Sequence, residues 1–178
     1  MGKVICLDAG HGGADPGAVG VTGVKEKDIN LLVAQKVRDK LADNYLVVMT
    51  RDKDTYLNLS GRAEIANEEG ASLFISIHCN AFTNPKAEGV ETFHYHSSTQ
   101  GKLLALEIQR SLAAVTGAMN RGVKSASFKV LRDTAMPAVL VELGFLTNAK
   151  EEKLLNTEKY QDTCAKAIAH GIREYLAR

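Results

Sequence analysis

The chain has 178 residues, of which 45% are apolar and 24% are charged, and its formal net charge is +1. This length and composition predict a single globular domain over residues 1–178, which we expect to be a monomer. A charge so close to neutral argues against nucleic acid as a partner, because that function needs a basic surface. No apolar run approaches the roughly 20 residues that span a bilayer, so we expect no membrane span. The N-terminus also lacks the basic and apolar segments of a signal peptide.

Apolar runs and segments of helical periodicity alternate along the chain. The pattern predicts, in order, a strand at 3–9, a helix at 27–44, a strand at 45–51, a helix at 60–69 and strands at 73–78 and 89–96. These are followed by a helix at 99–116, strands at 127–131 and 138–145, and helices at 149–155 and 157–177. Strands that alternate with helices predict an α/β fold. We expect a twisted, mostly parallel (mixed) sheet of about six strands, flanked by helices on both faces.

The first strand runs into a glycine-rich loop that carries His11. Gly10 opens the loop, but Asp15 stands where a dinucleotide-binding motif requires glycine, and no helix begins at once. The glycines instead allow a tight turn, through which the imidazole can reach the crevice beyond the carboxyl ends of the strands. His11 is therefore either a metal ligand or a polar residue of a surface loop.

Glu26 and His78 are two further candidates. Glu26 precedes the first helix, where an acidic side chain either complements the helix dipole or serves as a ligand. His78 ends a buried strand, either as a ligand or as a core histidine satisfied by one hydrogen bond. Successive strand residues point to opposite faces. Asn80 should therefore share the face of His78, where it could contact a substrate carbonyl or amide, and Cys79 should point away.

Glu142 interrupts the apolar segment 138–145. Burying a carboxylate in such a strand is costly unless the group is paired, protonated or used in chemistry. Arg62, Lys124 or Arg132 could form a structural ion pair with it. The functional alternative is a base that activates water beside a metal. Both interpretations stay open from the residues alone.

The remaining histidines offer an alternative set of ligands. His94 and His96 share a face of one strand, and they would replace His11 and Glu26 if those residues do not bind a metal. His170 lies on a helix rich in Ala, Lys and Arg, and we expect it at the surface. Two histidines, one carboxylate and a spare carboxylate match the parts of a hydrolytic zinc site.

Four main sequence blocks follow one another along nearly the whole chain. They are Leu7-Asp8-Ala9-Gly10-His11-Gly12-Gly13 with Asp15 and Gly17, Lys25-Glu26-Lys27, Ser76-Ile77-His78-Cys79-Asn80-Ala81, and Val141-Glu142-Leu143-Gly144-Phe145-Leu146-Thr147-Asn148. Together they resemble the zinc-dependent N-acetylmuramoyl-L-alanine amidases of the Amidase_3 family, which are bacterial cell-wall hydrolases. The resemblance implies that His11, Glu26 and His78 bind one Zn²⁺ ion and that Glu142 is the catalytic glutamate.

This resemblance also implies a reaction and a substrate. The enzyme would hydrolyse the amide between the lactyl group of N-acetylmuramic acid and L-alanine of the peptidoglycan stem peptide. Metal-activated water would attack the carbonyl, with Glu142 as general base and then acid. We expect Asp8 to orient a ligating imidazole, and Arg62 and Asn80 to bind substrate. The enzyme would act on the cell wall, as a secreted autolysin or after release at lysis, and any wall-binding module would lie outside this chain.

Two rival functions share some of these features. A zinc peptidase of carboxypeptidase type would use the same metal chemistry, but it would cut between amino acids and release no free muramic acid. A non-catalytic glycan- or peptide-binding module would have the fold without bound zinc or cleavage. The products of a digest therefore distinguish the three functions.

Overall fold

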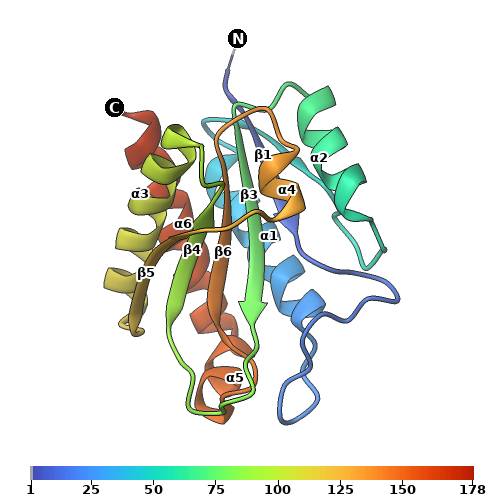
Figure 1. Cartoon of the computed structure of the whole chain (residues 1–178), viewed down its shortest axis with the longest axis vertical. Coiled ribbons are helices and arrows are strands. Elements are labelled where there is room, and N and C mark those ends of the chain that lie inside the picture. Colours follow the sequence, from blue (N-terminus) through green and yellow to red (C-terminus); the bar gives the residue numbers. More distant parts are fainter. Residues whose placement is uncertain (1) are drawn as a thin grey trace.

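Six strands form one continuous sheet in the computed structural model, which describes residues 2–178 (Figure 1). Their order across the sheet is β2-β1-β3-β6-β4-β5. The most apolar runs form β1, β3 and β6, which lie inside the sheet, as expected of strands buried on both faces. The strands are β1 (Val4–Ala9), β2 (Leu46–Met49), β3 (Leu73–Asn80), β4 (Val90–His94), β5 (Asn120–Ser125) and β6 (Ala138–Phe145).

The carboxyl ends of four strands lie at the same edge of the sheet. β2, β1, β3 and β6 run parallel, β4 runs antiparallel to β6, and β5 runs parallel to β4. The sheet is therefore mixed and mostly parallel, as the sequence predicts. Because β4 is reversed, its first residues lie beside the last residues of β6. One row across the sheet consequently holds His78 of β3, Glu142 of β6 and Glu91 of β4.

Helices cover both faces of the sheet unequally (Figure 1). α1, α3 and α6 bury the larger core, which includes Leu7, Ile75 and Val139. α2 and α4 lie over a smaller core around Phe74 and Leu140, and they leave the carboxyl ends of β3 and β6 uncovered on that face. No helix within residues 2–178 combines the length and apolar character needed to cross a membrane. The helices are α1 (Glu26–Leu41), α2 (Leu59–Glu68), α3 (Thr99–Thr116), α4 (Lys129–Arg132), α5 (Ala149–Leu155) and α6 (Glu158–Leu176).

The predicted strand at 127–131 is wrong. These residues lead into α4, and the fifth strand is β5, a few residues earlier. Val130 and Leu131 are both buried in the smaller core. Adjacent residues of a strand would point to opposite faces, whereas one helical turn can place both against the same core. β5 is a polar edge strand without the apolar alternation that marks a half-buried strand, so its sequence carries little signal. The other predicted strands and helices are confirmed to within a few residues at their ends.

Candidate metal centre

His11 follows β1 in a left-handed backbone conformation, with a φ of 62°. Residues with a Cβ rarely adopt this conformation, and such strain persists where the surrounding structure enforces it. Here Gly12 and Asp15 exchange backbone hydrogen bonds of 2.9 and 3.1 Å, which close the turn. Nδ1 of His11 lies 2.8 Å from Oδ2 of Asp15, and Nε2 lies 3.2 Å from Oε2 of Glu26. The loop therefore holds both ring nitrogens in fixed contacts.

Two glycines allow the loop to approach the other site residues closely. A Cβ on Gly10 would lie 2.2 Å from the ring of His78. A Cβ on Gly17 would lie 2.5 Å from Oε2 of Glu26 and 2.7 Å from the ring of His11, and Gly17 also has a φ of +66°. Glycine at positions 10 and 17 is thus explained by the space that three neighbouring side chains occupy.

Glu26 is the first residue of α1, and only 4% of it is exposed. Its Oε1 lies 2.9 Å from Nδ1 of His78 and accepts a hydrogen bond from the side-chain amide of Asn30. Its Oε2 accepts the backbone N–H of Ala18 at 2.8 Å and lies near Nε2 of His11. The start of the helix therefore positions the carboxylate between the two imidazoles.

His11, Glu26 and His78 form a compact cluster of possible metal ligands. Their ligand atoms all lie within 4.8 Å of one another. The two imidazole rings meet edge to face, with their centroids 5.1 Å apart. Two imidazoles and one carboxylate are a donor set that zinc accepts in catalytic sites, where a further position stays open for water or substrate.

The charges of these side chains depend on one another. Burial opposes ionisation of Glu26, but hydrogen bonds with His11 and His78 outweigh that effect and lower the pKa of Glu26 far below its ordinary value. Burial also disfavours a charged His11, yet its contacts with Glu26 and Asp15 raise the pKa of His11. A metal ion among these groups would compete with that proton, so metal affinity should increase with pH.

Glu142 lies beside the cluster on β6, directly opposite His78 on β3. Its Oε2 is buried and has no hydrogen-bond partner within residues 2–178. Burial, followed by the charges of Glu26 and Glu91, raises the pKa of Glu142 well above its ordinary value. An unpartnered buried carboxyl group is costly, and a strongly shifted pKa in a cleft is typical of functional groups.

The structural alternative for Glu142, an ion pair with a nearby cation, is wrong. Each cation considered for that role binds another carboxylate. The pairs are Arg62–Asp8, Lys124–Glu91 and Arg132–Asp133. Glu142 therefore keeps a free carboxyl group at the edge of the cluster.

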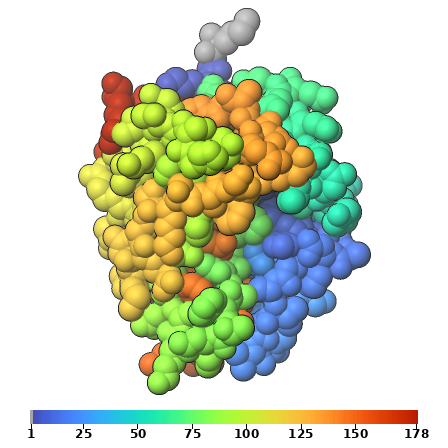
Figure 2. Space-filling model, viewed as in Figure 1, coloured from blue at the N-terminus to red at the C-terminus, as the bar shows by residue number. Residues whose placement is uncertain are grey.

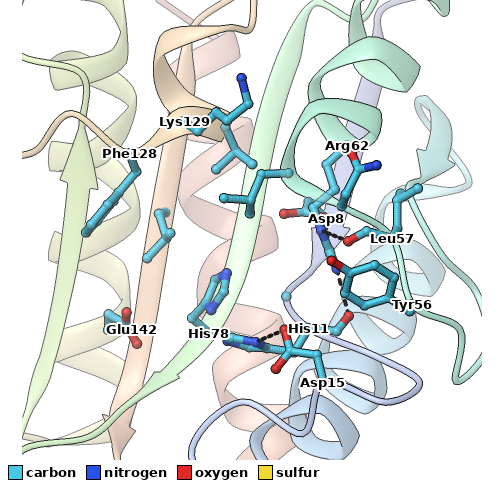
Figure 3. A pocket seen from close by; sticks show the side chains of 15 residues that line it. Asp8, His11, Asp15, Tyr56, Leu57, Arg62, His78, Phe128, Lys129 and Glu142 are labelled. Atoms are coloured by element: carbon cyan, nitrogen blue, oxygen red, sulfur yellow. Dashed lines mark hydrogen bonds and ion pairs between the residues drawn. The ribbon is translucent and has the colours of Figure 1, made fainter.

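A cavity of about 300 Å³ opens over the cluster and Glu142. Figure 3 shows His11, His78 and Glu142 at one end of it, with Tyr56 and Phe128 on opposite sides. In Figure 2 this face is hollowed between the yellow-orange segment that contains α4 and the blue loop after β1. The apolar part of the cavity lining is Tyr56, Leu57, Leu59, Phe128, Val130 and Leu140.

Asp8 and Arg62 position the loop that carries His11, and the contacts of Asp8 differ from its predicted role. The Asp8 carboxylate accepts hydrogen bonds from Thr50 at 2.7 Å, Ser76 at 2.6 Å and Arg62 at 2.8 Å, and none from an imidazole. Burial opposes its charge, but Arg62 and the two hydroxyl groups lower the pKa of Asp8. Arg62 is 2% exposed, and its guanidinium donates a hydrogen bond of 2.8 Å to the carbonyl oxygen of His11. Arg62 therefore supports the turn of His11, and because it also lines the cavity, its contact with substrate stays a prediction.

Two positioning residues were not singled out from the sequence. Asp15 takes the place expected for Asp8, beside Nδ1 of His11. Arg51 follows β2, is 4% exposed and donates to the carbonyl oxygens of Ala9 and Gly10 at 2.8 and 3.0 Å. The only sequence signal for Asp15 was its place in the first block, and Arg51 had none.

The remaining candidates lie outside the cluster. Asn80 shares the face of His78 as expected, but it donates to Glu91 at 2.7 Å, and its contact with substrate stays a prediction. Cys79 packs in the larger core, which confirms that it points away. His94 and His96 belong to no group of three possible ligands in the described part of the chain. His170 lies on α6 and is exposed, which confirms its expected position at the surface.

A mixed α/β sheet with a His–Glu–His cluster and a spare buried carboxyl group at its strand ends has the parts of a metal-dependent hydrolase. Residues 5–174 match the Amidase_3 family, described as N-acetylmuramoyl-L-alanine amidase. The chain belongs to this family of enzymes.

Relatives and solved structures agree with that assignment. The N-acetylmuramoyl-L-alanine amidase LytC of Bacillus subtilis (strain 168) is 41% identical over 98% of this chain, which spans only 36% of LytC. The endolysin of Bacillus phage SPP1 is 42% identical over 99% of this chain and 67% of the endolysin. The crystal structure of an N-acetylmuramoyl-L-alanine amidase from Clostridium difficile 630 matches with a TM-score of 0.96 and 39% identity, covering 99% of this chain and 97% of that one.

Proposed function

We propose that this chain hydrolyses the amide between the lactyl group of N-acetylmuramic acid and L-alanine of the peptidoglycan stem peptide, with one bound Zn²⁺ ion. The observation that carries the proposal is a cluster of three possible ligands, two of which line the same cavity as one unpartnered carboxyl group. Membership of the amidase family supports the choice of bond.

The donor set fits zinc. His11, Glu26 and His78 would hold the ion through two imidazole nitrogens and one carboxylate oxygen. When bound, Zn²⁺ supplies Lewis acidity, which polarises a carbonyl group and makes water more acidic. The lowered pKa of Glu26 keeps its carboxylate charged for this purpose. Asp15 holds the other nitrogen of His11, the kind of contact that orients a ligating imidazole.

Glu142 would move the proton. Its raised pKa makes it a stronger base than an ordinary carboxylate, and its free Oε2 can accept a proton without losing a hydrogen bond. It takes a proton from water as the water oxygen attacks the carbonyl carbon. It then delivers a proton to the alanine nitrogen as the C–N bond breaks. The products are a lactyl carboxylate on the glycan and a peptide with a free N-terminal alanine.

We also propose that the enzyme acts on the cell wall as a monomer, outside the cell or after lysis. One chain contributes every ligand of the cluster and Glu142, so the site needs no second copy. Its partner would be peptidoglycan, recognised locally in the cavity because the net charge of +1 provides little long-range attraction. LytC is much longer than this chain, and a wall-binding module would lie outside residues 1–178.

Mass spectrometry of digested peptidoglycan tests this function. The purified protein is incubated with peptidoglycan, with and without a chelator, and the soluble products are identified. We expect intact stem peptides with a free N-terminal alanine, bare glycan, and loss of both products when the chelator is present. Fragments cut within the stem would instead indicate a peptidase. No cleavage even with zinc restored would contradict the proposal and favour a binding module.

A further inference from the structure

A second hollow, of about 430 Å³, lies beyond the cluster of His11, Glu26 and His78, on the side of β4 and β5. It does not include His11, His78 or Glu142, so it is separate from the first cavity. Its charged and amide side chains come from the end of β3 and the loop that follows, from the start of β4 and from β5. They are Asn80, Asn84, Lys86, Glu91, Arg121 and Lys124.

One row of residues across the sheet connects this second hollow to His78. Glu91 of β4 lies directly opposite Glu142 of β6, which itself lies opposite His78 of β3. Arg121 and Lys124 of β5 both contact Oε2 of Glu91, with Nε of Arg121 at 3.0 Å. β5 is two strands from β6, so the backbones of these two strands are about 10 Å apart.

The hollow has an excess of positive charge, although the whole chain has a net charge of only +1. Glu91 is 4% exposed and provides the single carboxylate of the lining, against Lys86, Arg121 and Lys124. The side chains of Arg121 and Lys124 remain 32% and 41% exposed. One buried carboxylate therefore holds two cations in place without neutralising both.

Both cations keep unused hydrogen-bond donors. Nε of Arg121 bonds to Glu91 and Nη1 to the carbonyl oxygen of Glu88, while no acceptor for Nη2 is found among residues 2–178. Lys124 has three N–H donors and one hydrogen bond, to Glu91, within the same range. The guanidinium also rests on the ring of Phe145, 4.9 Å from its centroid. Two neighbouring cations with free N–H donors suit a ligand with carboxylate chemistry.

We propose that Arg121 and Lys124 bind the free carboxylate on the second residue of the peptide that departs with L-alanine, and so determine specificity for an acidic stem. This inference rests on the proposed function and names the substrate group that the second hollow takes. The residue after L-alanine in peptidoglycan is D-glutamate joined through its side chain, which leaves its α-carboxylate either free or amidated. An extended peptide advances about 3.5 Å per residue. Both cations contact Glu91, which lies opposite Glu142, so a stem peptide that runs from Glu142 toward β5 brings this carboxylate to them.

The test compares two muramoyl tetrapeptides that differ only in having a carboxylate or a carboxamide at that position. For the wild-type protein we expect a lower KM for the carboxylate form. Arg121→Gln and Lys124→Gln should each raise that KM by about tenfold, because a hydrogen bond between ionised groups has an effect of this order. We expect little change in kcat, and little change in either constant for the carboxamide. Lys166→Ala, at an exposed lysine on α6 behind the sheet, is the matched control.

Conservative variants distinguish charge recognition from a folding defect. Arg121→Lys and Lys124→Arg keep the charge, so they should keep the preference for the carboxylate. Equal wild-type efficiency on both substrates, or the same loss on both in the Gln variants, would overturn the inference and leave the amidase function intact. Failure of the wild-type protein to cleave either substrate would overturn the proposed function and this inference with it.

Discussion

His78 and Glu142 lie directly opposite each other on the parallel strands β3 and β6, but only His78 has a side-chain partner. Nδ1 of His78 lies 2.9 Å from Glu26, whereas Oε2 of Glu142 has no hydrogen bond within residues 2–178. Neighbouring strands are separated by about 4.8 Å. The sheet therefore fixes the spacing between the proposed metal ligand and the group that would move the proton.

Replacing either histidine with alanine should remove the metal. His11→Ala and His78→Ala each delete one of three ligands, so zinc content should fall from about one ion per chain to near zero, and amide hydrolysis should fall with it. Metal analysis after dialysis, together with a turnover assay, measures both. His170→Ala, which changes an exposed histidine on α6, should keep zinc and activity. Full zinc occupancy in either site variant would exclude that histidine as a ligand.

Glu142→Gln should separate metal binding from catalysis. The amide keeps the shape of the side chain but cannot take a proton, so we expect normal zinc content and a kcat lower by about 10²- to 10⁴-fold. The metal-free variant should unfold at the same or a higher denaturant concentration than the wild type, because an unpaired buried carboxyl group is lost. Glu158→Gln, at an exposed glutamate of α6, is the control. A near-normal kcat in Glu142→Gln would remove Glu142 from the role of base.

Gly10→Ala should displace the ring of His78. The new Cβ would lie 2.2 Å from that ring, so the imidazole or the loop must move. We expect a zinc affinity lower by about 10- to 100-fold, the range found when the support of a ligand is disturbed. Competition with a chelator of known affinity measures the change. Gly2→Ala is the control, since its Cβ would meet no atom within 4 Å. Unchanged affinity in Gly10→Ala would show that the ring has room to shift.

The Asp8–Arg62 pair should make stability depend on pH in the acidic range. The pKa of Asp8 is lowered in the folded protein, relative to about 3.9 in an unfolded chain. Ionised Asp8 therefore stabilises the fold fully above about pH 4, and this stabilisation is lost as the pH falls through the lowered folded value. Asp8→Asn should reduce the free energy of unfolding by about 3 kcal/mol at pH 7, because Arg62 loses its buried partner.

Denaturant titrations of the wild type and Asp8→Asn at several pH values test this dependence. The difference between their free energies of unfolding should stay constant from pH 7 to about pH 5 and decrease below about pH 4. Asp39→Asn, at an exposed carboxylate of α1, should show a small and nearly constant difference. A difference for Asp8→Asn that does not decrease in acid would contradict the lowered pKa.

The meeting of the main site residues was predictable because it follows from topology. His11 and His78 end apolar runs, and parallel strands in an α/β fold bring their carboxyl ends to one edge. Glu142 was recognisable as a carboxyl group in an apolar strand. The structure brings these residues to one cavity edge, as expected, with Glu26 in contact with both histidines, while their catalytic and ligand roles stay predictions.

The supporting contacts were not predictable from the local pattern. Asp8 binds Thr50 and Arg62, which are 42 and 54 residues away in sequence, so its partners depend on the completed fold. The contact of Asp15 with His11 depends on the left-handed turn at His11, a conformation that residues with a Cβ rarely adopt. β5 was misplaced because an exposed edge strand has no buried face to impose apolar alternation.

Titration of zinc into metal-free protein, followed by release of peptides with an N-terminal alanine from peptidoglycan, tests the central claim most directly. We predict no release without metal, a linear rise in rate with added zinc, and a plateau at about one ion per chain, since residues 2–178 contain one cluster of three possible ligands. Hydrolysis by the metal-free protein, or full zinc binding without release of such peptides, would contradict zinc-dependent amidase activity at this site.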